Sequence, residues 1–493
     1  MRVQQICLGV STHKQLSSPA EVNPSDRKKD RERCTASLLR SCPASVWPEG
    51  SATAHSHPML VTVEDHIDHI SAIHEALRAA IVNIVNRWWS DTKANFPARM
   101  PIEPYEESLL RWMEALPAGT TRPFDECLGS WRPDFLIEDV VDASKPGGTR
   151  EQFRICEINA RFCWNGFFHG AYGQRALDDL GAREKGFRGA ADCEETINEL
   201  LTLVDTSKPL HLLKGEEHGI DIWLLAWAAE QRTGIRPRFI TPEDLRLVPC
   251  DKAPLGQKLC CVIPSDAITS PESTVFELEG ERLEDVHQVN LELHQRELRA
   301  MPIKVLRHLS LRCFNDLRVI LLVHDKRMLG IILQELDALV HRHGVLTPKQ
   351  AEILREGIST TFIPGSSEIS QLKKDCHHNP NLKDNFILKP IRSGKGAGIL
   401  FGDELSPEDW QTKLESCQQA TIFPGQISYI VQRKIPQAIY DVYSRDSEES
   451  RKMHLVGTYH VVNGRYLGLG TWRSSPARIC AISRGGSWIC SIY

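Results

Sequence analysis

The sequence lacks any run of about 18 consecutive apolar residues, which is the shortest stretch expected of a membrane-spanning helix. It also lacks the continuous apolar stretch of a signal peptide, because polar residues at positions 4, 5 and 11–13 flank the short patch Ile6–Val10. These absences argue against a membrane protein and against secretion. We therefore expect a cytoplasmic protein with no membrane partner.

Basic residues are not in excess, and paired cysteines are missing. Lys and Arg number 59 against 64 Asp and Glu, a formal net charge of −5, so the strongly basic footprint of a nucleic-acid-binding protein is absent. None of the 15 cysteines stands in a C-x-x-C pair of the kind that holds zinc or carries out thiol redox chemistry. We therefore expect reduced thiols and no nucleic-acid partner. Any phosphate-binding site must depend on a local group of basic residues.

What the chain does have is the composition of an ordinary globular protein. Its 493 residues are 41% hydrophobic and 25% charged, which suits roughly two or three domains. Residues 1–58 differ, because Ser, Pro and charged residues dominate and no apolar period would build a core. We predict a disordered leader there, with Met59 as an alternative start of the functional protein. Nothing in the sequence indicates an oligomeric state.

Apolar periodicity predicts a mixed α/β fold after the leader. Val63–Trp89 repeats apolar side chains at steps of three and four, the period of an amphipathic helix. Trp131–Ala160 predicts a β-hairpin whose strands are joined by the loop Asp142–Gly148. From 175 to 345, helical stretches alternate with short apolar strands, one of them at Arg318–Val323, and strands prevail toward the C-terminus.

A glycine-rich segment follows the predicted strand Phe386–Pro390, which contains Lys389. The turn consists of Gly394, Lys395, Gly396 and Ala397. Glycine lets backbone amides approach phosphates without obstruction by Cβ, so the segment suits a lid over a nucleotide that Lys389 would reach. A Walker loop requires Ser or Thr after its lysine, and here Lys395 is followed by Gly396. The remaining alternative is an ordinary hairpin turn with solvated lysines.

Polar side chains alternate along both strands of the predicted hairpin. Arg132 and Asp134 are two residues apart on the first strand, as are Glu157 and Asn159 on the second. Side chains at i and i+2 share a face, so each pair can project into one site. Asp, Glu and Asn oxygens suit Mg²⁺, and an arginine beside them would hold a phosphate. A surface hairpin is the alternative, but apolar Ile155 shares the face of Glu157, and charges in apolar surroundings need partners.

Three further segments carry residues that suit a nucleotide. Lys326 lies where the apolar segment before it meets a predicted helix, a position at which basic residues can meet an anion. The strand that contains Ile430 and Gln432 could supply backbone groups to an adenine edge. Arg473 follows a predicted hairpin whose turn is Asn-Gly. The alternatives are a solvated helix start, a plain strand, and an arginine that only caps the fold.

Taken in order, these segments resemble the glutathionylspermidine synthase-type branch of the ATP-grasp superfamily. That pattern has an R-x-D-F strand, an E-x-N strand, later lysines, a K-P-x-x-G-x-x-G-A loop and a terminal glycine-arginine strand. Its counterparts here are Arg132-Pro133-Asp134-Phe135, Glu157-Ile158-Asn159-Ala160, Lys326, Lys389 with its glycine loop, and Gly468-Leu469-Gly470 with Arg473. The resemblance covers residues 130–480 as separate islands.

The resemblance implies a fold and a set of ligand-binding residues. The fold would be ATP-grasp (α/β, α+β), with a helical and α/β pre-ATP-grasp region at 59–310 that carries the hairpin and a nucleotide-binding region at 311–493. The implied ligands are ATP and Mg²⁺. The implied metal ligands are Asp134, Glu157 and Asn159. The implied ATP-binding residues are Lys326, Lys389, Gly394, Lys395, Gly396, Ala397, Ile430 and Gln432, and the implied catalytic residues are Arg132 and Arg473.

The implied activity is ATP-dependent ligation of a small-molecule carboxylate to an amine through an acyl phosphate. After Asn159-Ala160 the chain continues with Arg161-Phe162-Cys163, where the family usually has acidic and hydroxyl residues that handle its peptide substrate, so glutathione and spermidine are not implied. No separate Cys/His amidase domain is evident. Ligases of this kind also occur in specialised-metabolite pathways. Two alternatives are a non-catalytic nucleotide-binding or partner-binding module and a kinase that releases a phosphorylated small molecule.

Overall fold

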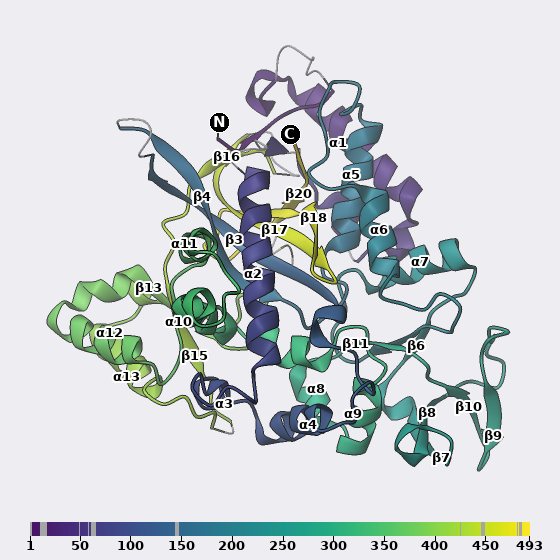
Figure 1. The fold of residues 1–493 in the computed structure, drawn as a ribbon. Coiled ribbons are helices and arrows are strands. Elements are labelled where there is room, and N and C mark those ends of the chain that lie inside the picture. The colour runs from purple at the N-terminus through teal and green to yellow at the C-terminus, as the bar shows by residue number, and fades with distance from the viewer. Residues whose placement is uncertain are drawn as a thin grey trace.

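The computed structural model of the protein describes residues 2–9, 17–48, 50–57, 59–60, 66–142, 147–423, 425–444, 449–480, 482 and 486–493. Helices and strands mix along most of these residues, in agreement with the predicted α/β class (Figure 1). Among them, no helix combines the length and the apolar character needed to cross a bilayer.

A seven-stranded sheet occupies the middle of the molecule (Figure 1). Its strands are β3 (Ser130–Val141), β4 (Thr149–Asn159), β16 (Tyr440–Val442), β17 (Arg451–Val462), β18 (Arg465–Leu469), β19 (Trp472–Ser475) and β20 (Ser487–Ile489). The order across the sheet is β20, β19, β17, β3, β4, and β16 and β18 also pair with β17. This sheet joins strands from before and after residue 310, and the predicted division of the chain at that residue stays a prediction.

Both hairpins predicted in this sheet are confirmed. β3 and β4 pair antiparallel, and positions 143–146 of the predicted loop between them lie outside the described residues. β17 and β18 are joined by Asn463 and Gly464, whose φ angles are +46° and +79°. A two-residue turn with positive φ at both positions is the type I′ turn, which explains the Asn-Gly sequence.

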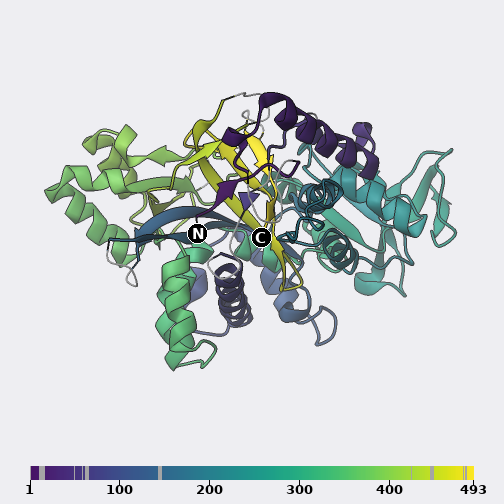
Figure 2. The ribbon, with the colours of Figure 1, turned by 90° about the horizontal axis from the view of Figure 1, so that it is seen from above.

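Helices and aromatic side chains fill one side of the sheet. α2 (Asp68–Asn86) crosses it and packs with α10 (Arg327–His341) and α11 (Pro348–Gly357), and it confirms the predicted helix over its described part (Figure 1). Figure 2 shows these helices projecting from the sheet. The rings of Phe135 and Phe153 stack with centroids 4.5 Å apart, which ties β3 to β4.

The N-terminal segment is folded, so the prediction of a disordered leader is wrong for the described parts of 1–58. α1 (Pro24–Ser41) packs on α5 (Phe167–Asp179), and its Leu38 is fully buried. α1 also buries Arg27 and Asp30. Because much of its contact face is polar, the helix has little of the apolar periodicity by which sequence reasoning recognises a packed element.

A second, parallel sheet lies beside α5. β5 (His211–Lys214) runs parallel to β11 (Val289–Glu292) on one side and to β6 (Arg238–Ile240) on the other. An antiparallel sheet follows, formed by β7 (Leu245–Pro249), β8 (Gln257–Val262), β9 (Val275–Leu278) and β10 (Glu281–Asp285). β5 and β8 confirm the short apolar strands predicted in this region.

A smaller lobe carries the glycine-rich segment. Its sheet has the order β12, β15, β13, β14, with bounds Thr361–Phe362, Tyr429–Arg433, Phe386–Pro390 and Leu400–Phe401. α12 (Ser367–His378) and α13 (Pro407–Ser416) pack against each other beside this sheet, at the left of Figure 1. Trp410 is fully buried in a hydrophobic core that belongs to this lobe. The lobe therefore has a core of its own.

The remaining α-helices and strands lie outside the sheets described above. They are β1 (Gln4–Gln5), β2 (Met59–Leu60), β21 (Ser491–Ile492), α3 (Phe96–Arg99), α4 (Pro104–Glu114), α6 (Cys193–Leu201), α7 (Ile222–Thr233), α8 (Gln295–Ala300) and α9 (Ile303–Ser310). The strand predicted at Arg318–Val323 is wrong, because Val319–Val323 is a π-helical turn. All five of its residues are buried, and a fully buried apolar run looks the same in sequence whether it is strand or helix.

Candidate functional site

The residues singled out in the sequence come from distant parts of the chain and meet between the large sheet and the small lobe. Asp134 of β3 lies directly opposite Glu157 of β4, and Arg132 lies opposite Asn159. The small lobe is joined to β4 at this place, since the backbone N–H of Ser359 donates to the carbonyl of Ile155 at 2.9 Å.

A β-bulge shapes the floor of the site. Asp134 pairs with Glu157 but Phe135 pairs with Ile155, so Cys156 is an extra residue in β4. The residue added by a bulge is left out of the ladder. The carbonyl of Cys156 instead accepts hydrogen bonds from Lys389 Nζ at 3.1 Å and from Gln432 Nε2 at 3.3 Å. The bulge thereby ties the hairpin to β13 and β15 of the small lobe.

The two predicted catalytic arginines both contact Asp134. Arg132 donates from Nε to Asp134 Oδ1 at 3.0 Å and from Nη1 to Asn165 Oδ1 at 2.7 Å. Arg473 of β19 contacts Asp134 Oδ2 through Nη2. The carboxylate of Asp134 is 1% exposed and thus sits between two guanidinium groups. Such pairs hold both partners in a fixed geometry.

Glu157 is surrounded by positive charge. Its Oε2 lies 3.4 Å from Lys326 Nζ and 4.0 Å from Lys389 Nζ. Burial by itself would raise the pKa of Glu157, but the surrounding lysines and arginines hold this pKa well below its ordinary value. Burial, more than any other cause, lowers the pKa of Lys326, although the carboxylates of Glu157 and Asp325 oppose this shift. With its pKa held low in this way, Glu157 is ionised at neutral pH.

The glycine loop, residues 393–397, contacts Lys326. Its Ser393 carbonyl accepts a hydrogen bond from Lys326 Nζ at 2.6 Å, and Ala397 N–H donates to Gly394 O at 3.0 Å. Gly396 has φ +71°, and a Cβ there would lie 2.3 Å from Ile479 Cγ2. Lys395 reaches away from the other lysines and pairs with Glu217, Nζ to Oε1 2.9 Å. The loop thus spans from Lys326 to Glu217.

The strand predicted to meet adenine is an inner strand. β15 lies between β12 and β13, so Ile430 pairs with Lys389 and Gln432 pairs with both Ile387 and Thr361. Gln432 contributes its side chain to the site, through Lys389 and the carbonyl of Cys156. The role of this strand in binding adenine stays a prediction.

Asp325 is a site residue that sequence reasoning missed. It accepts hydrogen bonds from Arg327 Nε at 2.9 Å and Arg392 Nε at 3.1 Å, and with Arg327 it flanks Lys326 in the chain. Asp325 is 2% exposed and Arg327 is 1% exposed. The signal in the sequence is the charged run His-Asp-Lys-Arg, in which the aspartate and the arginine stand two residues apart. This ion-paired group fixes the backbone that presents Lys326.

Asp325→Asn is expected to lower the free energy of unfolding by about 2 kcal/mol at pH 7. Burial would raise the pKa of Asp325, but Arg327 and Arg392 bring it from 3.8 to about 2. A carboxyl group whose pKa is lower in the folded state stabilises that state above its unfolded pKa, and the effect is lost as pH falls toward the folded pKa. Urea unfolding at pH 7 and pH 3 measures the difference, which should shrink at pH 3; an equal difference at both values would contradict the assignment.

Three buried N–H groups near the site indicate which kind of ligand it can bind. Asn159 Nδ2, Arg473 Nε and Arg392 Nη2 are buried and have no hydrogen-bond partner among the described residues. Buried donors of this kind ordinarily have an acceptor. The four cations of Arg132, Arg473, Lys326 and Lys389 outnumber the two carboxylates that they contact, Asp134 and Glu157, so the site suits an anion that arrives with a metal ion. These N–H groups can donate to phosphate oxygens, and the carboxylates of Asp134 and Glu157 offer the oxygen ligands that Mg²⁺ prefers.

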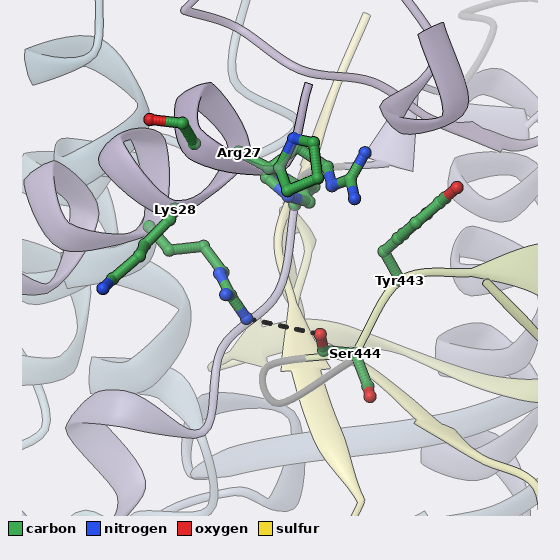
Figure 3. A pocket seen from close by; sticks show the side chains of 8 residues that line it. Arg27, Lys28, Tyr443 and Ser444 are labelled. Carbon is green, nitrogen blue, oxygen red and sulfur yellow. Dashed lines mark hydrogen bonds between the residues drawn. The ribbon is translucent and has the colours of Figure 1, made fainter. Parts of the chain in front are cut away.

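A cavity of about 250 Å³ lies elsewhere, against the first turns of α1 (Figure 3). Its lining consists of Pro24, Ser25, Arg27, Lys28, Arg31, His57, Tyr443 and Ser444. The guanidinium of Arg27 lies 4.6 Å from the centre of the Tyr443 ring. None of the residues predicted for the site lines this cavity, so it is separate from the chemistry described above.

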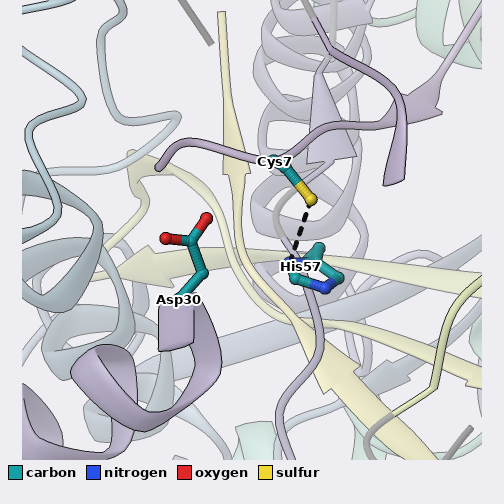
Figure 4. Close-up of side chains that lie close together, drawn as sticks. All are labelled: Cys7, Asp30 and His57. Carbon is teal, nitrogen blue, oxygen red and sulfur yellow. Dashed lines mark hydrogen bonds between the residues drawn. The ribbon is translucent and has the colours of Figure 1, made fainter. Parts of the chain in front are cut away.

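Two side-chain clusters among the described residues bring three metal-ligating atoms within 4.8 Å of one another. In the first, Cys7 Sγ lies 3.7 Å from His57 Nδ1, with Asp30 beside them (Figure 4). Burial raises the pKa of the Cys7 thiol to about 12, so it is no nucleophile at neutral pH. In the second cluster, which is His211, Cys261 and Glu284, the carboxylate already bonds Arg238.

Comparison with known proteins gives three similarities. A family model described as the AnkG N-terminal domain matches residues 73–322. The ATP-grasp enzyme ankG of Aspergillus thermomutatus is 34% identical over 482 residues, which covers 97% of this chain and 96% of that protein. The solved structure of a glutathione synthetase-like effector from Globodera pallida, in its apo form, superimposes with a TM-score of 0.48 at 12% identity, over 96% of this chain and 98% of the effector.

Proposed function

The chain belongs to the family of the ATP-grasp enzyme ankG, and from this premise we propose that it is an ATP-dependent ligase that joins a small-molecule carboxylate to an amine. The membership confirms the resemblance found in the sequence. The observation that carries the proposed reaction is the grouping of Lys326 and Lys389 around Glu157, beneath a glycine loop. Positioned positive charge of this kind is what phosphoryl transfer requires from a protein.

Asp134, Glu157 and Asn159 would hold Mg²⁺, with phosphate oxygens completing its shell. When bound, the ion would neutralise part of the charge on the ATP phosphates. Asp134 is already held by Arg132 and Arg473, so its carboxylate is oriented before any ligand arrives. The positive charge of these arginines also reduces the repulsion between the carboxylates and the phosphates of ATP.

The proposed reaction has two steps. An oxygen of the substrate carboxylate attacks the γ-phosphorus of ATP, ADP leaves, and an acyl phosphate forms. Lys326 and Lys389 offset the charge that develops on the phosphoryl oxygens. The amine then attacks the acyl carbon and inorganic phosphate leaves. Arg473 has a donor to spare for the oxyanion of this second step, because its Nε has no partner among the described residues.

The glycine loop would keep water away from the acyl phosphate, and Gly396→Val tests this role. Valine at φ +71° is strained and would meet Ile479, at a cost of about 1–3 kcal/mol within the loop. We expect turnover to fall by roughly ten-fold or more, with a smaller effect on overall stability. Gly344→Val is the matched control, since Gly344 has φ +63°, is exposed outside the loop, and has nothing within 4 Å of a Cβ. Unchanged turnover in Gly396→Val would remove the loop from the mechanism.

The experiment that tests the proposed function is ADP release by the purified protein. Mg·ATP is offered with pooled carboxylates together with amino acids, small peptides and polyamines. A ligase releases ADP and phosphate only when both partners are present, and yields a product that contains both minus water. Phosphate retained in the product would identify a kinase. ATP binding without turnover in every pool would favour the non-catalytic module.

A further inference from the structure

The carboxyl edge of the parallel sheet carries a second set of polar groups beside the proposed nucleotide site. β11 ends at Glu292, and β5 continues into the segment that carries Glu217. Glu217 is 8% exposed and bonds Lys395 of the glycine loop at 2.9 Å. The loop therefore reaches this edge, which is the part of an α/β sheet where ligands bind.

Two acceptors at this edge have no salt-bridge partner among the described residues. Asn290 and Glu292 share a face of β11, and Asn290 Nδ2 donates to Glu292 Oε1 at 3.4 Å. Asn290 is 0% exposed, and its Oδ1 accepts no hydrogen bond from a described residue. Glu292 is 1% exposed, and burial raises its pKa to about 8, with a smaller contribution from Glu217. A buried carboxyl group in this state favours a cation beside it.

One donor near the same edge also lacks a partner. Arg161 follows the end of β4, and its Nε is buried without a hydrogen-bond partner among the described residues. The neighbouring Phe162 ring lies edge-on to His294, with ring centroids 6.0 Å apart, and His294 Nε2 lies 3.4 Å from Glu217 Oε2. Because His294 is two residues after Glu292, these contacts place Arg161 near the same edge. The guanidinium stacks 4.5 Å from the ring centre of Phe162. The planar guanidinium of such an arginine can donate two parallel hydrogen bonds to a carboxylate.

A ligand that satisfies these groups carries a cationic donor and an anionic acceptor close together. We propose that the amine substrate is an α-amino acid, whose ammonium group contacts Glu292 and Asn290 and whose carboxylate contacts Arg161. This inference rests on the proposed function, because it names the amine partner of the ligase. A plain amine leaves Arg161 unpaired, and a simple carboxylate leaves Glu292 facing an anion.

The assignment gives Glu292 a part in the transfer step. The substrate's ammonium group favours the ionised form of Glu292. The carboxylate then takes one proton from the ammonium group, and the nitrogen lone pair forms the C–N bond to the acyl carbon. The C–O bond to phosphate breaks, and the phosphate leaves with the electron pair and a second nitrogen proton. Lys395 links Glu217 to the glycine loop, so closure over the nucleotide also covers the amino acid.

The test compares each L-amino acid with its C-terminal amide in the ADP-release assay, with pooled carboxylates present. For the amino acid that supports turnover, we expect its amide to have a KM at least roughly ten-fold higher, because the amide cannot make the charged contact with Arg161. Arg161→Gln should raise the KM of the amino acid by a similar factor and leave that of the amide almost unchanged. Glu292→Gln should lower kcat. Glu216→Gln is the control, because Glu216 is exposed and its side chain, among the described residues, pairs with Arg296.

The outcomes separate this inference from the proposed function. ADP release that depends equally on amino acids, their amides and plain amines would overturn the inference and leave the ligase standing. An Arg161→Gln enzyme with wild-type KM values for both compounds would do the same. No ADP release from any pool would overturn both. Thermal unfolding of each variant shows that the loss arises in a folded protein, and Arg161→Lys, which retains the charge, should recover part of the affinity.

Discussion

Replacing Lys389 with alanine is expected to lower kcat/KM for ATP by roughly 100- to 1000-fold, the range for loss of one preorganised charge-stabilising group. Lys389 is 5% exposed, and its Nζ is fixed by the carbonyl of Cys156 and by Gln432 at 3.3 Å. The ammonium group is therefore in place before ATP arrives, and no other lysine among the described residues contacts that carbonyl. ADP release at saturating carboxylate and amine measures the effect.

The control for this variant is Lys374→Ala, an exposed lysine on α12. It removes the same charge from the same lobe without touching the site, so its activity should equal that of the wild type. Thermal unfolding of both variants separates lost chemistry from lost structure. If Lys389→Ala turned over ATP as fast as Lys374→Ala, Lys389 would have no role at the phosphates.

Glu157→Gln is expected to reduce turnover by a similar factor, roughly 100-fold or more, while the protein still folds. The substitution keeps the size of the side chain and removes its charge. Glu157 is the carboxylate that Lys326 and Lys389 both approach, and its pKa is held low, so the change removes a real negative charge at neutral pH. Higher Mg²⁺ should recover part of the lost rate. ADP release across a magnesium titration is the measurement.

Glu352→Gln, at an exposed position of α11, is the matched control for this substitution. It should not alter the magnesium dependence. Retained turnover in Glu157→Gln, with the same response to magnesium as the wild type, would contradict the role of Glu157 as a metal ligand. If the wild-type protein bound ATP but did not turn it over, the non-catalytic module would be the better interpretation.

Much of the site followed from the sequence because its residues sit on strands with a two-residue repeat. Arg132 and Asp134, and Glu157 and Asn159, had to share faces once the hairpin was assigned, and the structure pairs them across β3 and β4. The Asn-Gly turn before Arg473 could be predicted equally well, because few residues tolerate positive φ at two successive positions.

Other features depend on contacts between distant segments, which one sequence does not display. The bulge at Cys156 and the ion pair between Asp325 and Arg392 are of this kind. The mostly polar α1 was mistaken for a disordered leader because its partner, α5, supplies much of the apolar surface. The run Val319–Val323 was mistaken for a strand because burial on all sides removes the period that separates strand from helix.

The central claim is that a carboxylate oxygen of the substrate is transferred to phosphate. The measurement that tests it most directly uses substrate labelled with oxygen-18 in its carboxylate, followed by mass spectrometry of the inorganic phosphate released in a complete turnover. An acyl phosphate intermediate predicts one labelled oxygen in each phosphate formed. Unlabelled phosphate, with amide formed at the normal rate, would show that the carboxylate is activated in another way and would contradict the account.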